Sequence, residues 1–281
     1  MEIKPVWIKK SIDPSSENLE KVKNILDAYC LNTVCQSAEC PNIFECFSKK
    51  TATFMILGNT CTRNCSFCAV NKGIPAPIDL NEPQNIAKAV TEMGLKYVVI
   101  TSVTRDDLKD GGAVHFVKVI KEIKKKSPDV KIEVLIPDFK GNKESLKKVV
   151  SEDIFVLNHN IETIEKKYPS IRAMAKYDRS LALLDTAKKE RPDIYVKSGF
   201  MLGFSETEED IKKLLKDLKE HSCDIVTIGQ YLRPSKENIA VKKYYTPKEF
   251  KKIKAFAESL HFKSIACDVF VRSSYMAANL I

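Results

Sequence analysis

The sequence predicts an α/β fold, a partial (β/α)6 barrel of the TIM type. Short β-rich runs alternate along the chain with longer amphipathic segments, in which apolar residues recur every three or four positions. Repeated strand–helix units favour a parallel sheet that curls into a barrel with its helices outside. The six predicted strands are residues 51–58, 96–102, 131–137, 154–160, 194–203 and 224–231.

The segments between these strands have the pattern of surface helices. Examples are "EPQNIAKAVTEMG", "AVHFVKVIKEIKKK" and "TEEDIKKLLKDLKEH", and Gly94 ends the first of them as a C-cap. The strand ends are polar and titratable, as in "GNTCTRNC", "TSVTRDD" and "NHNIET". Because barrel chemistry sits at the carboxyl ends of the strands, we expect the site there.

Two different segments flank this barrel. Residues 1–50 are irregular and rich in cysteine, with a helix predicted near residues 18–29. Residues 264–281 begin as a strand and end in a polar turn and a short tail. The predicted organisation is therefore an N-terminal extension (1–50), a barrel (51–263) and a C-terminal segment (264–281).

The composition, 44% hydrophobic and 30% charged, is that of a globular protein. We expect a cytoplasmic location without membrane association, because no apolar run has the length of a spanning helix and the N-terminus lacks a secretory apolar segment. Lysines account for much of the net charge of +9, and their helical spacing indicates solvated helix faces. An acidic protein partner or a nucleic acid is the alternative reading of this charge.

Cysteine usage indicates metal binding. The chain has nine cysteines, an odd number that argues against a disulfide framework, and seven of them lie within residues 30–68. The stretch "CTRNCSFC" follows the first strand and supplies Cys61, Cys65 and Cys68. Three thiolates on an iron–sulfur cluster leave one iron with an open coordination position. A zinc site would need a histidine, and none lies nearby.

This loop resembles that of the radical S-adenosylmethionine superfamily, including the aromatic Phe67 before the last cysteine. The resemblance implies a 4Fe-4S cluster on Cys61, Cys65 and Cys68, with S-adenosylmethionine bound at its open iron. Reductive cleavage of that cofactor gives a 5′-deoxyadenosyl radical, which can abstract hydrogen from an unactivated carbon.

A second set of cysteines precedes the barrel. Cys35, Cys40 and Cys46 have four and five residues between them, which matches neither a ferredoxin nor a zinc knuckle. Cys30 is a candidate fourth thiolate, and spacing alone does not dismiss it.

Here the chain resembles the lipoyl synthase family. The resemblance rests on this set, on "RSSY" at residues 272–275, and on "ITSVTRDDLKDGGA", "NHNIET", "KSGFMLGFSETEE" and "TIGQYLRPS". It implies that the hydroxyl of Ser274 completes a second, auxiliary 4Fe-4S cluster on Cys35, Cys40 and Cys46, and that this cluster supplies sulfur. The chain departs from the family where Met276 replaces a histidine and "ACDVF" replaces a Gly-Pro pair, which affects details of the C-terminal segment.

The resemblance implies a sulfurtransferase that inserts two sulfur atoms, at C6 and C8, into an octanoyl chain on a lysine of a lipoyl carrier domain. Its partners would be that carrier, in a 2-oxoacid dehydrogenase E2 or glycine cleavage H protein, and a flavodoxin or ferredoxin as electron donor. We expect a monomer that binds no nucleic acid.

Other classes of protein fit the sequence less well. A biotin-synthase-like enzyme would lack the N-terminal set and the "RSSY" motif, and a two-cluster electron carrier would close each cluster with four thiolates. An RNA-binding iron–sulfur protein would present aromatic residues among its lysines, and the chain has one tryptophan.

Further candidates follow the strands. Arg105 and Asp106 come after the second strand, where the methionyl part of the cofactor would bind, although a solvated charged turn is the alternative. Asn158 and Glu162 end the fourth strand and could contact the cofactor, or Asn158 could cap a helix. Lys197, in the fifth strand, could reach the cofactor carboxylate.

The remaining candidates are few. Arg272 carries a fixed charge that could position a cluster or the substrate, and together with Ser274 it is a candidate catalytic residue. His159 is expected to satisfy a buried hydrogen bond. Cys223 and Cys267 are expected to be core or surface thiols, and the same interpretation is favoured for Cys30.

Overall fold

A computed structural model describes residues 4–9 and 16–281. Part of the predicted N-terminal extension therefore lies outside the described residues. The same holds for part of the N-terminal stretch in which no secretory signal is predicted. The main sheet has seven parallel strands in the order β1-β4-β5-β6-β7-β8-β9. These strands are β1 (Thr53–Ile56), β4 (Tyr97–Ser102), β5 (Lys131–Leu135), β6 (Val156–Asn158), β7 (Tyr195–Leu202), β8 (Ile225–Gln230) and β9 (Ser264–Cys267).

All six predicted strands are present, and the expected partial barrel is confirmed. Every residue of β1 and β8 is buried, as expected for a parallel sheet that is covered on both faces. A seventh strand, β9, pairs with β8 inside the segment predicted to begin as a strand, so the sheet extends past residue 263. β9 is short and only half-buried, which is why its sequence pattern is weak.

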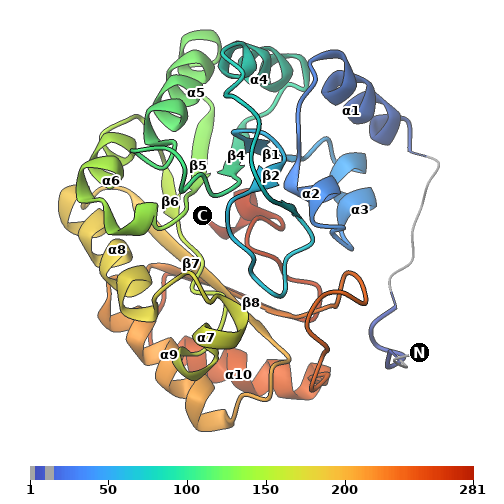
Figure 1. Cartoon of the computed structure of the whole chain (residues 1–281). Helices are drawn as coiled ribbons and strands as arrows, with labels where there is room; N and C mark the ends of the chain where they lie inside the picture. The colour runs from blue at the N-terminus through green and yellow to red at the C-terminus, as the bar shows by residue number, and fades with distance from the viewer. Residues whose placement is uncertain (1–3, 10–15) are drawn as a thin grey trace.

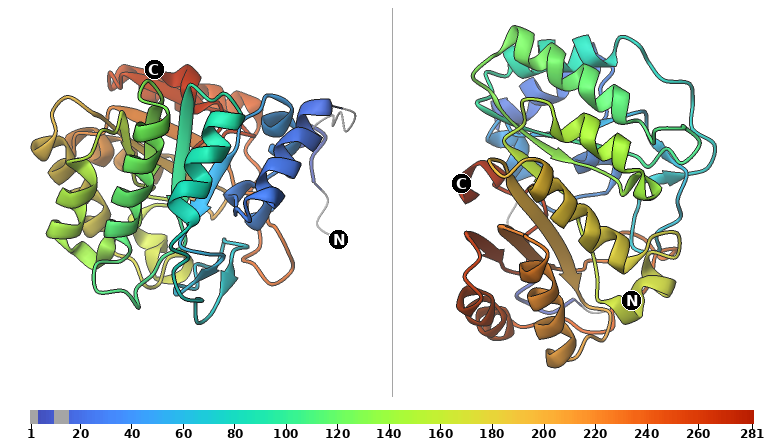
Figure 2. Two further views of the ribbon diagram at one scale, coloured as in Figure 1. Left: turned by 90° about the horizontal axis from the view of Figure 1, so that it is seen from above. Right: turned by 90° about the vertical axis from the view of Figure 1, so that its left-hand side faces the viewer.

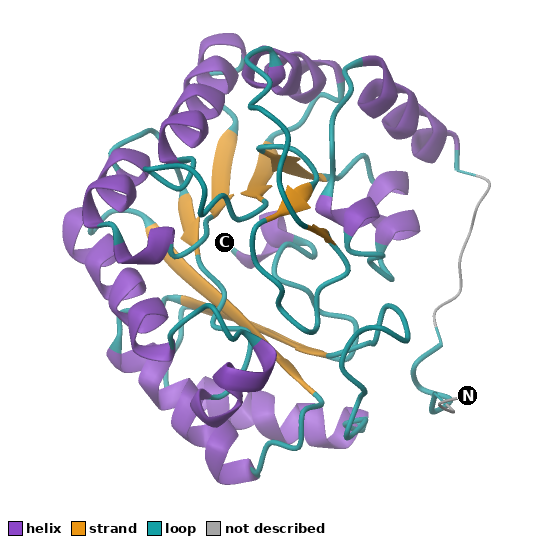
Figure 3. Cartoon of the chain, viewed as in Figure 1, coloured by secondary structure: helices purple, strands orange, loops and turns teal. Residues whose placement is uncertain are grey.

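Helices surround the sheet (Figures 1 and 3). Gly94 follows α4 with a φ of 67°, which confirms the predicted C-cap. The lysines of α5 and α10 lie largely on exposed faces. The α-helices are α1 (Glu17–Ala28), α2 (Val34–Ser37), α3 (Ile43–Ser48), α4 (Glu82–Glu92), α5 (Ala113–Lys126), α6 (Lys143–Val150), α7 (Tyr168–Ile171), α8 (Tyr177–Glu190), α9 (Glu208–Glu220) and α10 (Pro247–Ser259), with 3-10 turns η1 (Phe139–Gly141), η2 (Glu165–Lys167) and η3 (Ala277–Leu280).

Local sequence explains where several helices begin. Thr207 and Asp210 form a capping box at the start of α9, and Thr246 and Glu249 form another at α10. Among the described residues no helix is long and apolar enough to cross a membrane.

The cysteine-bearing helices near the N-terminus and the segment after β9 contact each other. The N-terminal helices α2 and α3 lie beside β1, and Thr33 forms an antiparallel bridge with Phe54 of that strand (Figure 1). The C-terminal segment follows β9 and runs along one side of the molecule (Figure 2, left). The Asn42 side-chain amide donates to the Phe270 carbonyl at 2.7 Å. This contact joins the two segments across 228 positions of sequence.

Two short features prepare the site. A two-stranded parallel ladder pairs β2 (Thr60–Cys61) with β3 (Asn71–Lys72), which closes the cysteine loop at its base. In β8, a Cβ atom on Gly229 would stand 2.0 Å from the Val271 carbonyl oxygen. Only glycine therefore allows the C-terminal segment to lie this close to β8.

Candidate functional site

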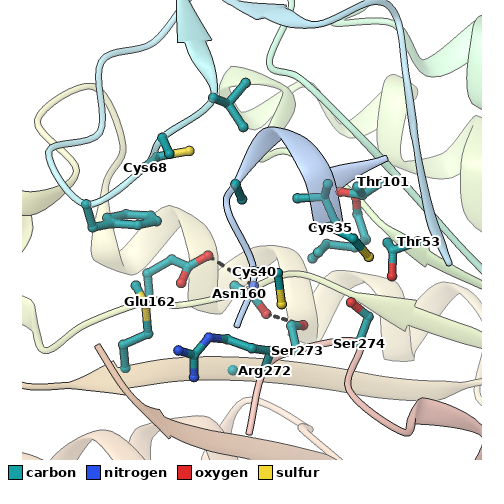
Figure 4. Close-up of a pocket in the computed structure, with 18 of the residues that line it drawn as sticks. Cys35, Cys40, Thr53, Cys68, Thr101, Asn160, Glu162, Arg272, Ser273 and Ser274 are labelled. Carbon is teal, nitrogen blue, oxygen red and sulfur yellow. Dashed lines mark hydrogen bonds between the residues drawn. The ribbon is translucent and has the colours of Figure 1, made fainter. Parts of the chain in front are cut away.

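One cavity of about 540 Å³ brings the two sets of cysteines together. The cavity opens among the ends of the strands, and Ser274 reaches it from the C-terminal segment. In Figure 4, Cys35, Cys40 and Ser274 lie together, while Cys68 lies apart from them. Its predicted metal ligands are Cys35, Cys40, Cys46, Cys61, Cys65, Cys68 and Ser274, and all of them line it.

The first set of thiols, Cys61, Cys65 and Cys68, occupies the loop after β1. Burial raises the pKa of Cys65 and raises that of Cys68 to about 12, with the charges of neighbouring thiols adding to the effect on Cys68. Thiolates are the form that binds iron, so a cation at this loop would have to offset the cost of burying them.

Arg63, inside this loop, ties it to the barrel. Its guanidinium donates to both carboxylate oxygens of Asp106 at 2.8 and 2.9 Å and to Asp138 at 2.6 Å. Burial would raise the pKa of Asp138, but the hydrogen bond and the charge of Arg63 outweigh it and lower that pKa well below its usual range. The loop is thus fixed by a buried ion-pair network.

A carboxylate and a guanidinium face the cavity beside Cys65. Burial raises the pKa of Glu162, which Asn160 and Arg172 partly counteract. Arg172 donates to the Asn160 carbonyl at 2.9 Å and to the Tyr168 hydroxyl at 3.1 Å. The opposite charges of Glu162 and Arg172 make this part of the cavity suited to a zwitterion such as the amino-acid end of a cofactor.

The second set of thiols lies where the N-terminal helices contact the C-terminal segment. Cys35 is in α2, which Thr33 caps through its side chain, and Cys46 is in α3. Burial raises the pKa of the Cys35 thiol to about 11, against hydrogen bonds with Thr53. The Tyr275 hydroxyl bonds the Glu45 carboxylate at 3.0 and 3.1 Å, which places Ser274 near this set.

The donor sets suit clusters rather than a single ion. Among the described residues, no group of three His, Cys, Asp or Glu side chains could hold one metal ion. The thiolates on a cluster bind different irons and therefore need not converge on one point. All nine cysteines are free, and each set presents three thiols to the cavity. The residues present fit two iron–sulfur clusters.

The structure places four of the predicted cofactor contacts outside the lining of the cavity. Arg105 is buried and paired with Asp107 at 2.8 Å, so this turn is not a solvated one. Asp106 pairs with Arg63. Asn158 caps no helix: it donates to Glu133 at 2.7 Å and to Ser273 at 2.8 Å.

Lys197 is the fourth predicted cofactor contact that does not line the cavity. Its ammonium group donates to the two carboxylate oxygens of Glu133 at 3.0 and 3.1 Å. Both side chains are fully buried. Among the predicted cofactor contacts, only Glu162 lines the cavity. The predicted catalytic residue Arg272 also lines it.

Sequence reasoning missed Arg63, Asn160 and Arg172. Asn160 and Arg63 lie inside the quoted motifs "NHNIET" and "CTRNC", which could have drawn attention to them, whereas Arg172 stands in "PSIRAM" with no local signal. His159 behaves as predicted: its Nδ1 donates to the Ile136 carbonyl at 2.8 Å, and its Nε2 accepts from Ser180 at 3.0 Å.

Comparisons define the class of protein. Residues 55–218 match the radical SAM superfamily. Solved structures agree on the fold: methylornithine synthase (17% identity, TM-score 0.57, 75% of this chain and 62% of that chain) and the hydrogenase maturase HydG (16%, TM-score 0.61, 88% and 65%). At these identities the likeness concerns the fold alone.

Curated relatives narrow the class to one family. The lipoyl synthase of Caldicellulosiruptor saccharolyticus is 53% identical over 98% of this chain and 96% of its own length. That of Alkaliphilus metalliredigens is 51% identical over 99% and 96%, and that of Aquifex aeolicus 50% over 92% and 94%. The chain belongs to the lipoyl synthase family of radical SAM enzymes. It is a sulfurtransferase of the predicted kind, and its cofactors are iron–sulfur clusters and S-adenosylmethionine.

Proposed function

We propose that this cavity inserts sulfur at C6 and C8 of an octanoyl chain carried on the lysine of a lipoyl carrier domain. The observation that carries the proposal is that two sets of three thiols and Ser274, from three distant parts of the sequence, line one cavity. Hydrogen abstraction and sulfur delivery would thus act on one bound acyl chain.

The radical side of the cavity would be assembled on the loop after β1. Cys61, Cys65 and Cys68 would hold the cluster to which S-adenosylmethionine binds, and the bound pair supplies the hydrogen-abstracting radical. Arg172 would hold the cofactor carboxylate and Glu162 its amino group, because the buried guanidinium and the half-buried carboxylate lie beside Cys65. Arg63 would fix the loop through Asp106 and Asp138.

The sulfur-donating side would be assembled from both ends of the chain. Cys35, Cys40, Cys46 and Ser274 would hold the auxiliary cluster, which supplies the sulfur atoms. A hydroxyl is an uncommon ligand of iron, and its weak hold would help that iron leave. Arg272 is half-buried beside Cys40, and its charge would offset that of the cluster.

The space between the two sides suits an acyl chain. Met55, Ile136 and Phe200 line the cavity together with the polar groups named above. A cavity of about 540 Å³ falls within the usual range of small-molecule pockets. An octanoyl group would therefore lie against apolar side chains with its carbons exposed to both clusters.

The reaction requires a protein carrier and a source of electrons. The carrier would be an E2 or H-protein domain, and the net charge of +9 would assist the docking of an acidic one. A flavodoxin or ferredoxin would supply electrons to a cytoplasmic monomer that binds no nucleic acid.

The test is anaerobic reconstitution, with iron and sulfide counting and an assay on an octanoylated lysine peptide. The proposal expects two clusters per chain, 5′-deoxyadenosine and a lipoylated product. One cluster per chain, or no 5′-deoxyadenosine, would refute it.

A further inference from the structure

A chain of hydrogen bonds crosses the interior of the barrel and ends at the cavity. It begins at Glu133 of β5, which accepts from Lys197 of β7 at 3.0 and 3.1 Å and from Tyr97 of β4 at 2.7 Å. Glu133 and Lys197 are fully buried, so each charge depends on the other. This ion pair is a fixed point on the barrel wall.

The Asn158 amide carries the chain onward. Its Nδ2 atom donates both to Glu133 at 2.7 Å and to the Ser273 hydroxyl at 2.8 Å. Its Oδ1 atom is buried and has no hydrogen-bond partner among the described residues. An unpaired buried amide oxygen is costly, so this orientation is held by the two bonds that the nitrogen makes.

Ser273 passes the chain to the cofactor side of the cavity. Its hydroxyl donates to the Asn160 Oδ1 atom at 2.8 Å, and Asn160 Nδ2 donates to Glu162 at 3.0 Å (Figure 4). Each donor and acceptor is used in one consistent direction, from Asn158 to the Glu162 carboxylate. Gly199 leaves room for this arrangement, because a Cβ there would stand 3.0 Å from Asn160 Oδ1.

We infer that Ser273 is a positioning residue that couples the two sides of the site. Ser274, the proposed ligand of the auxiliary cluster, is the next residue in the sequence. The series of hydrogen bonds leads from Ser273 to Glu162, the proposed cofactor contact. Anchored to Asn158, Ser273 fixes the C-terminal segment and orients Glu162 through Asn160. The inference rests on the proposed function for the roles of Ser274 and Glu162.

The test measures two properties of the reconstituted protein. One is the Kd for S-adenosylmethionine. The other is the rate at which a chelator removes iron in a Cys68→Ala background, where the remaining iron reports the auxiliary cluster. Ser273→Ala removes the hydroxyl that links Asn158 to Asn160. The variant should therefore raise the Kd roughly tenfold and speed iron loss roughly tenfold. Ser273→Thr keeps a hydroxyl and should restore most of both properties.

The controls separate this inference from the proposed function. Ser145→Ala removes another buried serine hydroxyl, on the outer helix α6, and should change neither property. Ser274→Ala should speed iron loss and leave the Kd within about twofold. An unchanged Kd in Ser273→Ala would overturn the inference, whatever Ser274→Ala does. Unchanged iron loss in Ser274→Ala would instead refute the ligand assignment.

Discussion

The hydroxyl of Tyr275 bonds the carboxylate of Glu45 at 3.0 and 3.1 Å, joining residues 230 positions apart. Each partner is the neighbour of a proposed cluster ligand, Ser274 on one side and Cys46 on the other. Burial, followed by the hydrogen bond to Glu45, raises the pKa of Tyr275 to about 12, so the phenol stays protonated and can donate. The bond therefore sets the distance between the two segments that would share the auxiliary cluster.

Tyr275→Phe should loosen the auxiliary site without unfolding the barrel. A hydrogen bond to a charged group contributes roughly 1.5–3 kcal/mol, so iron bound by the auxiliary set should be lost at least about tenfold faster to a chelator. Tyr29→Phe is the matched control, because the Tyr29 hydroxyl donates to Glu92 at 2.9 Å on an exposed surface. Equal iron loss in the two variants would show that the Tyr275 bond has no special role.

Cys30→Ala should leave the iron content unchanged. Cys30 is exposed at the end of α1 and does not line the cavity in the described part of the chain. Cys40→Ala, which removes a cavity thiol, should remove about half of the iron and sulfide when both are counted after reconstitution. If Cys30→Ala lost a cluster as well, the fourth ligand would be a thiolate, as spacing alone had left open.

Arg172→Gln should weaken cofactor binding. A buried charge-assisted contact to a carboxylate is worth roughly 1.5–3 kcal/mol, so the Kd for S-adenosylmethionine should rise about ten- to a hundredfold in equilibrium dialysis. The iron content should stay constant. Arg191→Gln removes a guanidinium that pairs with Asp193 away from the cavity, and it should bind the cofactor normally. A normal Kd in Arg172→Gln would assign the carboxylate to another residue.

Acid should destabilise the fold through His159. Burial lowers the pKa of this imidazole to about 4, below its ordinary value of 6.5, so the unfolded chain binds the proton more readily. Stability is therefore present above the unfolded pKa and falls as the pH drops from about 6.5 towards 4. Between about pH 7.5 and 5 the loss should be on the order of 2 kcal/mol. Denaturant titrations should show a flatter pH dependence for His159→Gln, and parallel curves would contradict the assignment.

The sequence predicted the strands well, because each is a short buried run between polar turns and amphipathic helices. The proposed cluster ligands, which are the cysteines of the two sets and Ser274, stand in dense motifs, and all of them line the cavity. The sequence could not predict what Lys197 contacts. A strand period of two shows that this side chain points inward, but its pairing with Glu133 spans β6 and depends on how the sheet curls.

Arg172 illustrates the same limit. Its position in the cavity is set by contacts with Asn160 and Tyr168, after the chain has turned through α7. No spacing rule connects such positions. The partial barrel was predictable from local pattern, whereas the cofactor side of the cavity is a product of tertiary packing.

The most direct test of the central claim is a single-turnover assay of Ser274→Ala beside the unsubstituted protein, each with its iron and sulfide counted first. Ser274→Ala should still form 5′-deoxyadenosine from S-adenosylmethionine, because Cys61, Cys65 and Cys68 are intact, but should insert no sulfur into the octanoyl peptide. Full sulfur insertion by Ser274→Ala would contradict the claim that Ser274 completes the sulfur-donating site.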